Sequence, residues 1–405
     1  MKNPKIRFKG FTEVWEQRKL KEVSERVRGN DGRMDLPTLT ISAGSGWLDQ
    51  QERFSGNIAG KEQQNYTLLT KGELSYNHGN SKLAKYGTVF ELRTYEEALV
   101  PRVYHSFRMT EQSSADFIEY MFSTKIPDKE LSKLVSSGAR MDGLLNINFE
   151  DFMNINITIP DVKEQMKIAK FLRELDNTVT LHQRKCDETK ILKKYMLQKM
   201  FPQNGSDVPE IRFSGFTNAW EQRKVGELSE STYGGGTPRT SNDSYWNGEI
   251  PWIQSSDLTE HQISNVQPRK YISESGLSNS ATKLIPENSI AIVTRVGVGK
   301  LAVMPFSYTT SQDFLSLSKL KTDVCFTAYL LYKKLQAELN YVQGTSIKGI
   351  TKEELLAKMV LVPEHSEQVK IGRYFYNLDN LITLHQRKCD ELKEIKKSML
   401  QNMFV

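Results

Sequence analysis

Several glycine-containing turns carry side chains that can hydrogen bond to nucleic acid. One turn begins at Asn77, after the run Leu74-Ser75-Tyr76, and another begins at Thr294, after residues 291–293, which we predict to form a buried strand. Arg can bridge O6 and N7 of guanine, Asn or Gln can bridge N6 and N7 of adenine, and such side chains also reach phosphates. These turns predict contacts with nucleic acid, although an ordinary surface loop remains the alternative for each of them.

The sequence lacks the motifs of common enzyme classes. Residues 297–301, Gly-Val-Gly-Lys-Leu, resemble a phosphate-binding loop, but the GxxxxGK[ST] spacing fails and Leu301 cannot ligate magnesium. There is no Asn-Pro-Pro-Tyr-like tetrapeptide, no GxSxG elbow and no HExxH helix. The acidic residues show no paired spacing typical of a metal-dependent nuclease. We therefore predict no catalytic residue in this chain.

Two His-Cys pairs at helical i, i+4 spacing are the only arrangement that suggests a metal. His182 with Cys186 and His385 with Cys389 would supply two His and two Cys, a ligand set that suits tetrahedral zinc. A packed, partly polar core layer that sets the register of two helices explains the same residues, and we favour it. No metal site is predicted.

These residues belong to a duplicated chain. Residues 6–19 and 211–224 are identical at 11 of 14 positions, and residues 163–201 and 366–404 at 24 of 39 positions. A shorter correspondence joins residues 138–143 to residues 344–349. The bodies between these shared blocks differ almost completely, apart from strand-like alternation. The pattern indicates one common frame that presents two different surfaces, with neutral drift as the alternative.

The shared segments predict two long helices. Residues 163–200 contain no Gly or Pro, and Asp161 with Glu164 suggests a capping box before them. Seam residues recur at steps of four and three, a period of 3.5 that is typical of a coiled coil. In order they are Ile168, Leu172, Leu175, Val179, His182 and Cys186, and Ile371, Phe375, Leu378, Ile382, His385 and Cys389. Each helix would span roughly 58 Å, and we expect the two to pair antiparallel about a pseudo-twofold axis.

The expected fold class is α+β, with two mixed α/β bodies that are each followed by a long helix. The predicted segments are a first body at 1–160, a helix at 161–201, a linker at 202–210, a second body at 211–363 and a helix at 364–405. At 405 residues the chain is too long for one ordinary core.

Composition and charge narrow the possible environments. No apolar run approaches twenty residues and the start lacks a signal-peptide pattern, so we expect neither a membrane span nor export. Three cysteines fit a reducing cytoplasm. The net charge is +6, but residues 163–199 and 367–397 alone carry about +7, which leaves the rest near −1. Because neutralised phosphates supply most non-specific affinity, we expect weak DNA binding by this chain without a partner.

Taken together, these motifs resemble the specificity subunit of type I restriction-modification systems over nearly the whole chain. The resemblance rests on IRFxGFT…WEQRK at Ile6 and Ile211, on GGTP with YWNGEIPWI at residues 235–253, and on KLIPENSIAIVTRVGVGKLAV at 283–303. GTSIKGI at 344–350, IPDVKEQ and VPEHSEQ before the helices, and LHQRKCDE within them complete the set.

The resemblance implies a chain without catalytic activity. Two target recognition domains would each read half of a split, asymmetric sequence in double-stranded DNA through the major groove. The helices would set the gap and hold two modification subunits, which bind S-adenosylmethionine and methylate adenine. Restriction subunits would add translocation and cleavage that depend on ATP and Mg²⁺. No cofactor is expected on this chain itself, and no membrane partner.

The family's DNA contacts are loop residues that vary, and they suggest candidates in both bodies. The predicted DNA-binding residues are Asn77, His78, Lys82 and Arg140 in the first body, and Thr237, Arg239, Gln254, Ser255, Thr294, Arg295, Lys300, Ser346 and Lys348 in the second. The alternatives are structural turns for these residues and, for the whole chain, a free-standing DNA-binding regulator, a scaffold that does not touch nucleic acid, or a cryptic enzyme.

Overall fold

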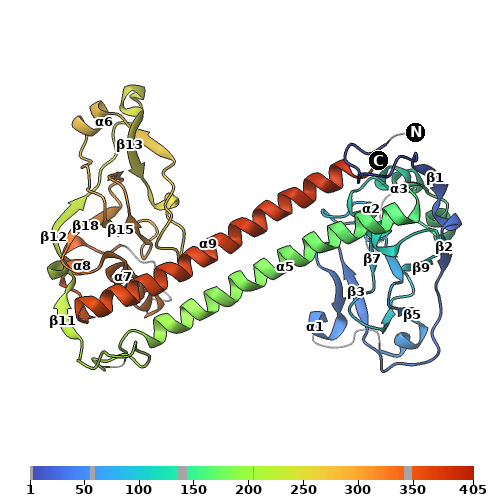
Figure 1. Cartoon of the computed structure of the whole chain (residues 1–405), viewed down its shortest axis with the longest axis horizontal. Coiled ribbons are helices and arrows are strands. Elements are labelled where there is room, and N and C mark those ends of the chain that lie inside the picture. The colour runs from blue at the N-terminus through green and yellow to red at the C-terminus, as the bar shows by residue number, and fades with distance from the viewer. Residues whose placement is uncertain (1–2, 55–59, 136–143, 204, 342–348) are drawn as a thin grey trace. The chain divides into compact units, whose positions relative to one another are not determined.

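A computed structural model describes residues 3–54, 60–135, 144–203, 205–341 and 349–405, which fold into two compact units. Unit 1 comprises Met1–Leu181 and Cys389–Val405, and unit 2 comprises His182–Lys388. The division crosses two long helices, α5 (Val162–Lys199) and α9 (His365–Asn402), drawn in green and red in Figure 1. Each unit therefore contains part of both helices.

Unit 1 is built mainly from short antiparallel strands. Its four-stranded sheet has the order β2-β9-β6-β7, and three two-stranded sheets pair β1 with β10, β3 with β4, and β5 with β8. The strands are β1 (Glu16–Lys19), β2 (Ser24–Arg26), β3 (Leu39–Ser42), β4 (Gly46–Asp49), β5 (Thr67–Thr70), β6 (Leu74–Asn77), β7 (Thr88–Glu91), β8 (Glu97–Val100), β9 (His105–Met109) and β10 (Asn156–Ile159). The short helices are η1 (Leu20–Glu22), α1 (Gln50–Phe54), η2 (Gly60–Asn65), α2 (Ala115–Ser123), α3 (Asp128–Leu134) and α4 (Phe149–Met153).

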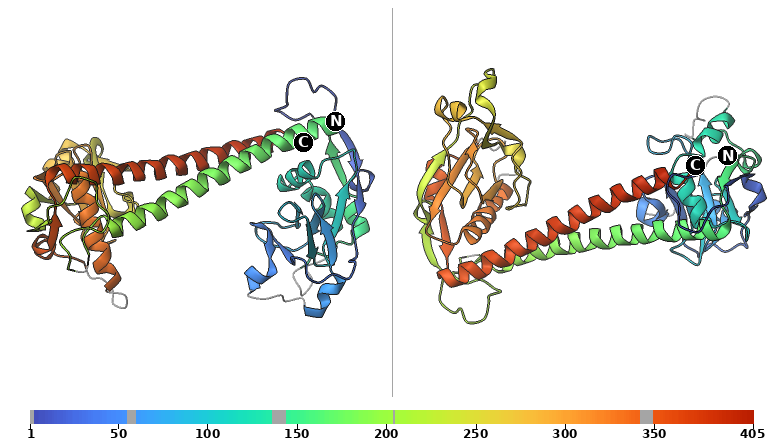
Figure 2. Two further views of the ribbon diagram at one scale, coloured as in Figure 1. Left: turned by 60° about the horizontal axis from the view of Figure 1, so that its bottom comes forward. Right: turned by 45° about the horizontal axis from the view of Figure 1, so that its top comes forward.

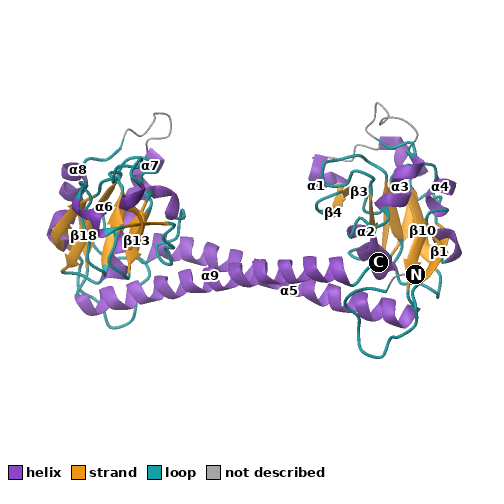
Figure 3. Cartoon of the chain, turned by 90° about the horizontal axis from the view of Figure 1, so that it is seen from above, coloured by secondary structure: helices purple, strands orange, loops and turns teal. Residues whose placement is uncertain are grey.

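Unit 2 follows a related plan with longer strands. Its sheets have the orders β12-β18-β15-β16, β14-β13-β17 and β11-β19. The strands are β11 (Glu221–Lys224), β12 (Ser229–Gly234), β13 (Trp246–Ile253), β14 (Lys270–Ile272), β15 (Ser289–Val293), β16 (Leu301–Met304), β17 (Thr309–Thr310), β18 (Phe314–Leu320) and β19 (Met359–Val362). The shorter helices are η3 (Val225–Leu228), η4 (Asp243–Tyr245), η5 (Ser255–Asp257), α6 (Glu274–Ser278), α7 (Val324–Tyr341) and α8 (Lys352–Ala357). Figure 3 shows strands and helices interleaved within each unit.

The apolar pattern of the sequence explains the central strand of unit 2. Every residue of β15 is buried, because the strand pairs with β16 on one side and with β18 on the other. Ile290, Ile292 and Leu317 then join one apolar core with Phe326 from α7. The prediction of a buried strand at residues 291–293 is confirmed.

The shared sequence blocks build the same contacts in both units. In unit 1, Arg7 forms two hydrogen bonds with the buried Glu164 and donates to the carbonyl of Glu13. In unit 2, Arg212 does the same with Glu367 and Asn218. Asp161 does cap α5, since its Oδ1 accepts from the amides of Lys163 and Glu164. The Glu164 carboxylate, however, binds Arg7, so the second half of the predicted capping box is replaced by an ion pair.

Each unit also closes its core with the end of a long helix. The backbone amide of Ile6 donates to the backbone carbonyl of Asn402 at 2.9 Å, and Met403 and Phe404 lie in the unit 1 core beside Trp15. The chain ends accordingly lie next to each other within unit 1 in both views of Figure 2. In unit 2 the amide of Ile211 donates to Lys199 at 2.9 Å, and Phe201 packs against Trp220.

Within each unit, the parts of α5 and α9 run antiparallel. In unit 2, His182 contacts His385, Cys186 contacts the carbonyl of Ile382, and Lys193 contacts Asp379. In unit 1, Asp176 contacts Lys396 and Val179 contacts Cys389. Residue numbers rise along one helix as they fall along the other. All twelve predicted seam residues are buried or half-buried, while the continuous coiled coil and its twofold axis remain predictions.

The His-Cys layer is a packed contact between the helices. The two Nδ1 atoms of His182 and His385 lie 3.0 Å apart and share a hydrogen bond, so at least one imidazole is neutral. Cys186 and Cys389 instead lie 3.8 Å and 3.5 Å from carbonyl oxygens of Ile382 and Val179. In the described part of the chain, no three His, Cys, Asp or Glu side chains gather closely enough to hold a metal ion.

The compact units divide the chain differently from the five segments expected from sequence, because each unit recruits parts of both long helices. Those segment boundaries remain a prediction. Among the described helices, none combines the length and apolar character needed to span a bilayer.

Candidate nucleic-acid interface

In unit 1 the candidate residues follow strand β6. Asn77 ends this strand, and its side chain is held by two hydrogen bonds. The side-chain Nδ2 donates to the carbonyl of Ile41, and the Oδ1 accepts from the backbone amide of Gly79 at 3.0 Å. Lys82 lies exposed in the turn that follows. Gly87 closes this turn at φ +82°, and a Cβ there would come within 2.5 Å of the Asn77 carbonyl oxygen. Only glycine permits this close return of the chain.

His78 lies inside unit 1, in contrast to the predicted surface position. Its imidazole and that of His105 both contact the carbonyl oxygen of Ile147, at 3.3 Å and 2.9 Å. Burial lowers the pKa of His105 to about 4. The His78 carbonyl accepts from the Leu145 amide at 2.9 Å, which holds the residues after 143 beside the Asn77 turn. Arg140 lies outside the described residues.

In unit 2 the equivalent turn follows strand β15. Thr294 is buried, and its hydroxyl donates to the carbonyl of Asp313 at 3.1 Å, so it also points inward rather than to the surface. Arg295 is exposed at the tip of the turn. The Thr294 carbonyl accepts from the Ile350 amide at 2.8 Å, as the His78 carbonyl does from Leu145. Ser346 and Lys348 lie outside the described residues.

Four loops of unit 2 meet at the ends of their strands, and we call residues 235–239, 254–257, 294–300 and 311–313 the loop cluster. The Thr237 hydroxyl donates to Gln312 at 2.6 Å, and the Ser311 amide donates to the carbonyl of Ile253. Gly235 makes this approach possible, since a Cβ would lie 2.0 Å from the Ser311 carbonyl oxygen. The structure therefore gathers candidates that are far apart in sequence.

The remaining candidates of the loop cluster differ in exposure. Arg239 is exposed, and its Nε donates to the Ser241 hydroxyl at 3.2 Å. Gln254 and Ser255 are half-buried where η5 begins. Gln312 is exposed on the same cluster but was missed by the sequence interpretation. Its signal was a polar Ser-Gln-Asp turn between two strand-like runs.

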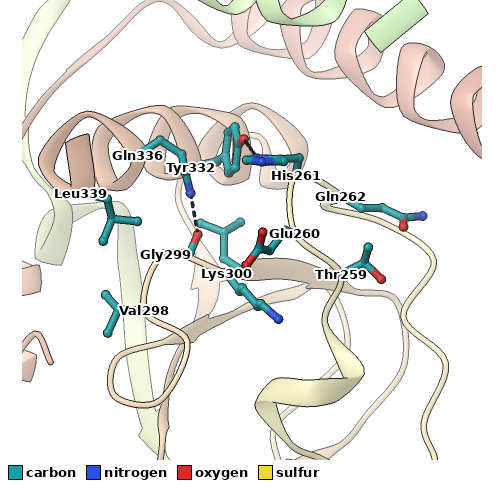
Figure 4. A pocket seen from close by; sticks show the side chains of 11 residues that line it. Thr259, Glu260, His261, Gln262, Val298, Gly299, Lys300, Tyr332, Gln336 and Leu339 are labelled. Carbon is teal, nitrogen blue, oxygen red and sulfur yellow. Dashed lines mark hydrogen bonds between the residues drawn. The ribbon is translucent and has the colours of Figure 1, made fainter. Parts of the chain in front are cut away.

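Lys300 lies in a small pocket behind the turn. The pocket, about 120 Å³, is formed by the turn, by residues 259–262 and by helix α7 (Figure 4). The Lys300 ammonium donates to the carbonyl of Leu258 at 3.2 Å, and Gln336 donates to the carbonyl of Gly299 at 3.4 Å. His261 Nδ1 and the Tyr332 hydroxyl, 2.5 Å apart, share a hydrogen bond, and burial raises the pKa of Tyr332 to about 12. These contacts support the turn from the side of α7 and of residues 258–262.

The arrangement is that of two units with matched frames and unlike loops. The chain matches the family described as Type I restriction modification DNA specificity domain over residues 12–190 and 217–394, and it belongs to that family.

Several relatives have been named within this family. The type I restriction enzyme MjaIX specificity subunit of Methanocaldococcus jannaschii is 27% identical over 195 residues, 46% of this chain and 44% of that protein. The EcoR124I/EcoR124II specificity subunit of Escherichia coli is 30% identical over 169 residues, 40% of this chain and 41% of that protein. The chain thus spans less than half the length of these two relatives.

Solved structures share the fold. The S subunit of a type I restriction-modification system from M. genitalium aligns with a TM-score of 0.64 at 12% identity, covering 100% of this chain and 99% of that one. A chain from a structural study of complex assembly and conformational transition in a type I R-M system aligns with a TM-score of 0.50 at 16% identity, covering 97% and 98%. At such low identity these alignments show a common fold.

Proposed function

We propose that this chain is the DNA sequence-specificity subunit of a type I restriction-modification complex. Unit 1 and unit 2 would each read one half of a bipartite, asymmetric target in double-stranded DNA. One observation carries the proposal: the two units have equivalent frames but loops of different sequence. The ion pair Arg7–Glu164 of unit 1 is matched by Arg212–Glu367 of unit 2. Two different reading surfaces on one frame suit a target whose halves differ.

The exposed candidates are the first choices for DNA contact. They are Lys82 in unit 1 and Thr237, Arg239, Gln312 and Arg295 in unit 2. Four further candidates are half-buried: Asn77, Gln254, Ser255 and Lys300. They would contact DNA only with the exposed part of the side chain, or would hold neighbouring loops in place. Arg140, Ser346 and Lys348 remain candidates from the sequence. Arg or Asn at such tips suits contacts with base edges in the major groove.

The long helices would set the gap between the half-targets and hold two modification subunits. Large apolar side chains stay exposed on both helices, which is typical of a surface that a protein partner covers. On α5 they include Met166, Leu181, Ile191, Leu192 and Tyr195, and on α9 they include Val369, Tyr376, Leu381, Leu384 and Ile395. The modification subunits would bind S-adenosylmethionine and methylate adenine. Restriction subunits would use ATP and Mg²⁺, all within the cytoplasm.

The test combines the full chain with its cognate modification subunit and S-adenosylmethionine on plasmid DNA, followed by single-molecule mapping of methylated adenine. We expect methylation only within a two-part motif. Replacing residues 211–363 with those of another family member should change one half of the motif alone. Methylation at a contiguous site would overturn the proposal. Tight and specific DNA binding by the isolated chain would also overturn it, because that is the behaviour of a free-standing regulator.

A further inference from the structure

Lys193 forms a buried ion pair between the two long helices in unit 2. Its side chain is 7% exposed, and its ammonium lies 2.5 Å from the carboxylate of Asp379 on α9, which is 3% exposed. The second oxygen of Asp379 accepts from the Tyr329 hydroxyl of α7 at 2.6 Å. A charge pair this deep needs all of its hydrogen bonds, since an unpaired buried charge is costly.

The same ammonium also reaches the backbone of a loop next to the proposed DNA-reading turn. It donates to the carbonyl oxygen of His261 at 2.8 Å. His261 has φ +62°, a left-handed conformation that is unusual for a residue with a side chain. Its imidazole shares a hydrogen bond with Tyr332. Lys193 therefore ties α5, α9 and α7 to one strained point of the loop.

That loop is one of the two supports of the turn that carries Arg295 and Lys300. The carbonyl oxygen of Leu258, three residues before His261, accepts a hydrogen bond from the ammonium of Lys300. Helix α7 supplies the other support through Gln336 and through Leu339, which leaves no space for a side chain at Gly299. Figure 4 shows His261, Tyr332, Gln336 and the Lys300 turn around one pocket. A change at Lys193 would thus be transmitted to the turn through the loop.

Unit 1 contains the equivalent pair in a simpler form. Lys396 contacts Asp176 at 2.5 Å, and Tyr120 donates to the same carboxylate at 2.7 Å. Lys396 is 26% exposed, and among the described residues it donates to no backbone carbonyl of a loop. The two lysines therefore join the helices alike, but Lys193 alone also holds a recognition loop.

We propose that Lys193 is a positioning residue for DNA recognition by unit 2. It holds the loop at residues 258–262 against the helix pair and thereby fixes the turn at residues 294–300. This inference rests on the proposed function, because it assigns Lys193 a role in reading one half of the target.

The experiment uses the full chain assembled with its modification subunit. Binding is measured by competition with duplexes that carry the correct target, a scrambled first half or a scrambled second half, the halves having been assigned by the exchange of residues 211–363. We expect Lys193→Met to lower discrimination against a scrambled second half by about tenfold, the scale of one charge-assisted hydrogen bond, and to leave discrimination at the first half unchanged. Lys396→Met, the matched control, should spare discrimination at the second half.

A double variant separates positioning from stability. Lys193→Met with Asp379→Leu removes both buried charges, so its melting temperature should return toward that of the parent chain, while discrimination at the second half stays low. The inference is wrong, and Lys193 acts only through stability, if the double variant restores discrimination at the second half. The same holds if Lys193→Met lowers discrimination at both halves equally. If the parent chain itself shows no bipartite discrimination, the proposed function fails instead.

Discussion

Arg7 and Glu164, 157 positions apart, form two parallel hydrogen bonds of 2.6 and 2.7 Å, and the carboxylate is fully buried. The Glu164 contact raises the pKa of Arg7, so the guanidinium stays charged. The pair fixes the segment before β1 onto the first turn of α5. We expect Arg7→Met to destabilise the chain by about 3–5 kcal/mol, because it leaves an unpaired buried charge.

Urea unfolding followed by circular dichroism measures this loss. Arg18→Met is the matched control, since Arg18 pairs with Glu16 at the surface and such pairs contribute about 0–1 kcal/mol. Equal losses in the two variants would contradict the role of the buried pair.

The half-buried imidazole of His105 should make stability depend on pH. Burial lowers its pKa to about 4, whereas the unfolded chain takes up this proton near pH 6.5. Between these values the unfolded state holds more protons, so stability falls as the pH decreases. The loss approaches about 3 kcal/mol as the pH falls toward 4 and is complete only below that value. In His105→Phe this part of the dependence should disappear in unfolding curves recorded from pH 7 to pH 4. His365→Gln, at the exposed start of α9, should keep it, and an unchanged slope in His105→Phe would refute the assignment.

Two neighbouring glycines offer a sharp test of the loop cluster. A Cβ at Gly235 would lie 2.0 Å from the Ser311 carbonyl oxygen, whereas a Cβ at Gly234 would meet nothing within 4 Å. Gly235→Ala should displace the loops at 235–239 and 311–313, cost about 1–3 kcal/mol of stability and weaken recognition of the second half-target. Gly234→Ala should be close to the parent in thermal melting and DNA competition. Similar behaviour of the two variants would show that the contact does not shape the surface.

Arg295 is the exposed basic side chain at the tip of the unit 2 turn. If it reads a base, Arg295→Ala should lower affinity for the correct second half by about 1–3 kcal/mol and relax the sequence preference at one base pair. Arg223→Ala is the control, because Arg223 is also exposed but pairs with Glu221 on β11. Competition assays with single-base variants of the target distinguish these results. A uniform loss over all sequences would indicate a phosphate contact instead.

Ile191 on α5 is 68% exposed, the most exposed large apolar residue of either long helix. Covered by a modification subunit, it would bury apolar surface, and Ile191→Asp should weaken the complex by about 2 kcal/mol or more. Sedimentation velocity of the mixed subunits measures the change. The melting temperature of the isolated variant should stay close to that of the parent. Unchanged assembly would place the partner on another face.

The repeat made much of the frame predictable. Residues 163–201 and 366–404 share the spacing of good helix formers, and the long helices α5 and α9 form there. The apolar run at 291–293 likewise becomes a buried strand. Local pattern suffices for such elements because it determines which face must leave water.

The reading surface was harder to predict, since contacts between distant residues decide which loop residues turn outward. His78 and Thr294 look like loop-tip donors in the sequence, but carbonyl groups of Ile147 and Asp313 draw them inward. Gln312 stands next to Thr237 only because Gly235 lets two loops approach, across 75 positions of sequence. Glu164 likewise meets an arginine that no local pattern pairs with it.

Unit 2 is one continuous stretch of chain, whereas unit 1 needs Met403 and Phe404 to complete the core around Trp15. During synthesis, residues 182–388 can therefore fold before the core of unit 1 is complete, because Met403 and Phe404 are translated last. Ribosome-bound chains arrested at increasing lengths should become resistant to protease first in unit 2. The order in which the two halves mature would then be the reverse of the order in which they are translated.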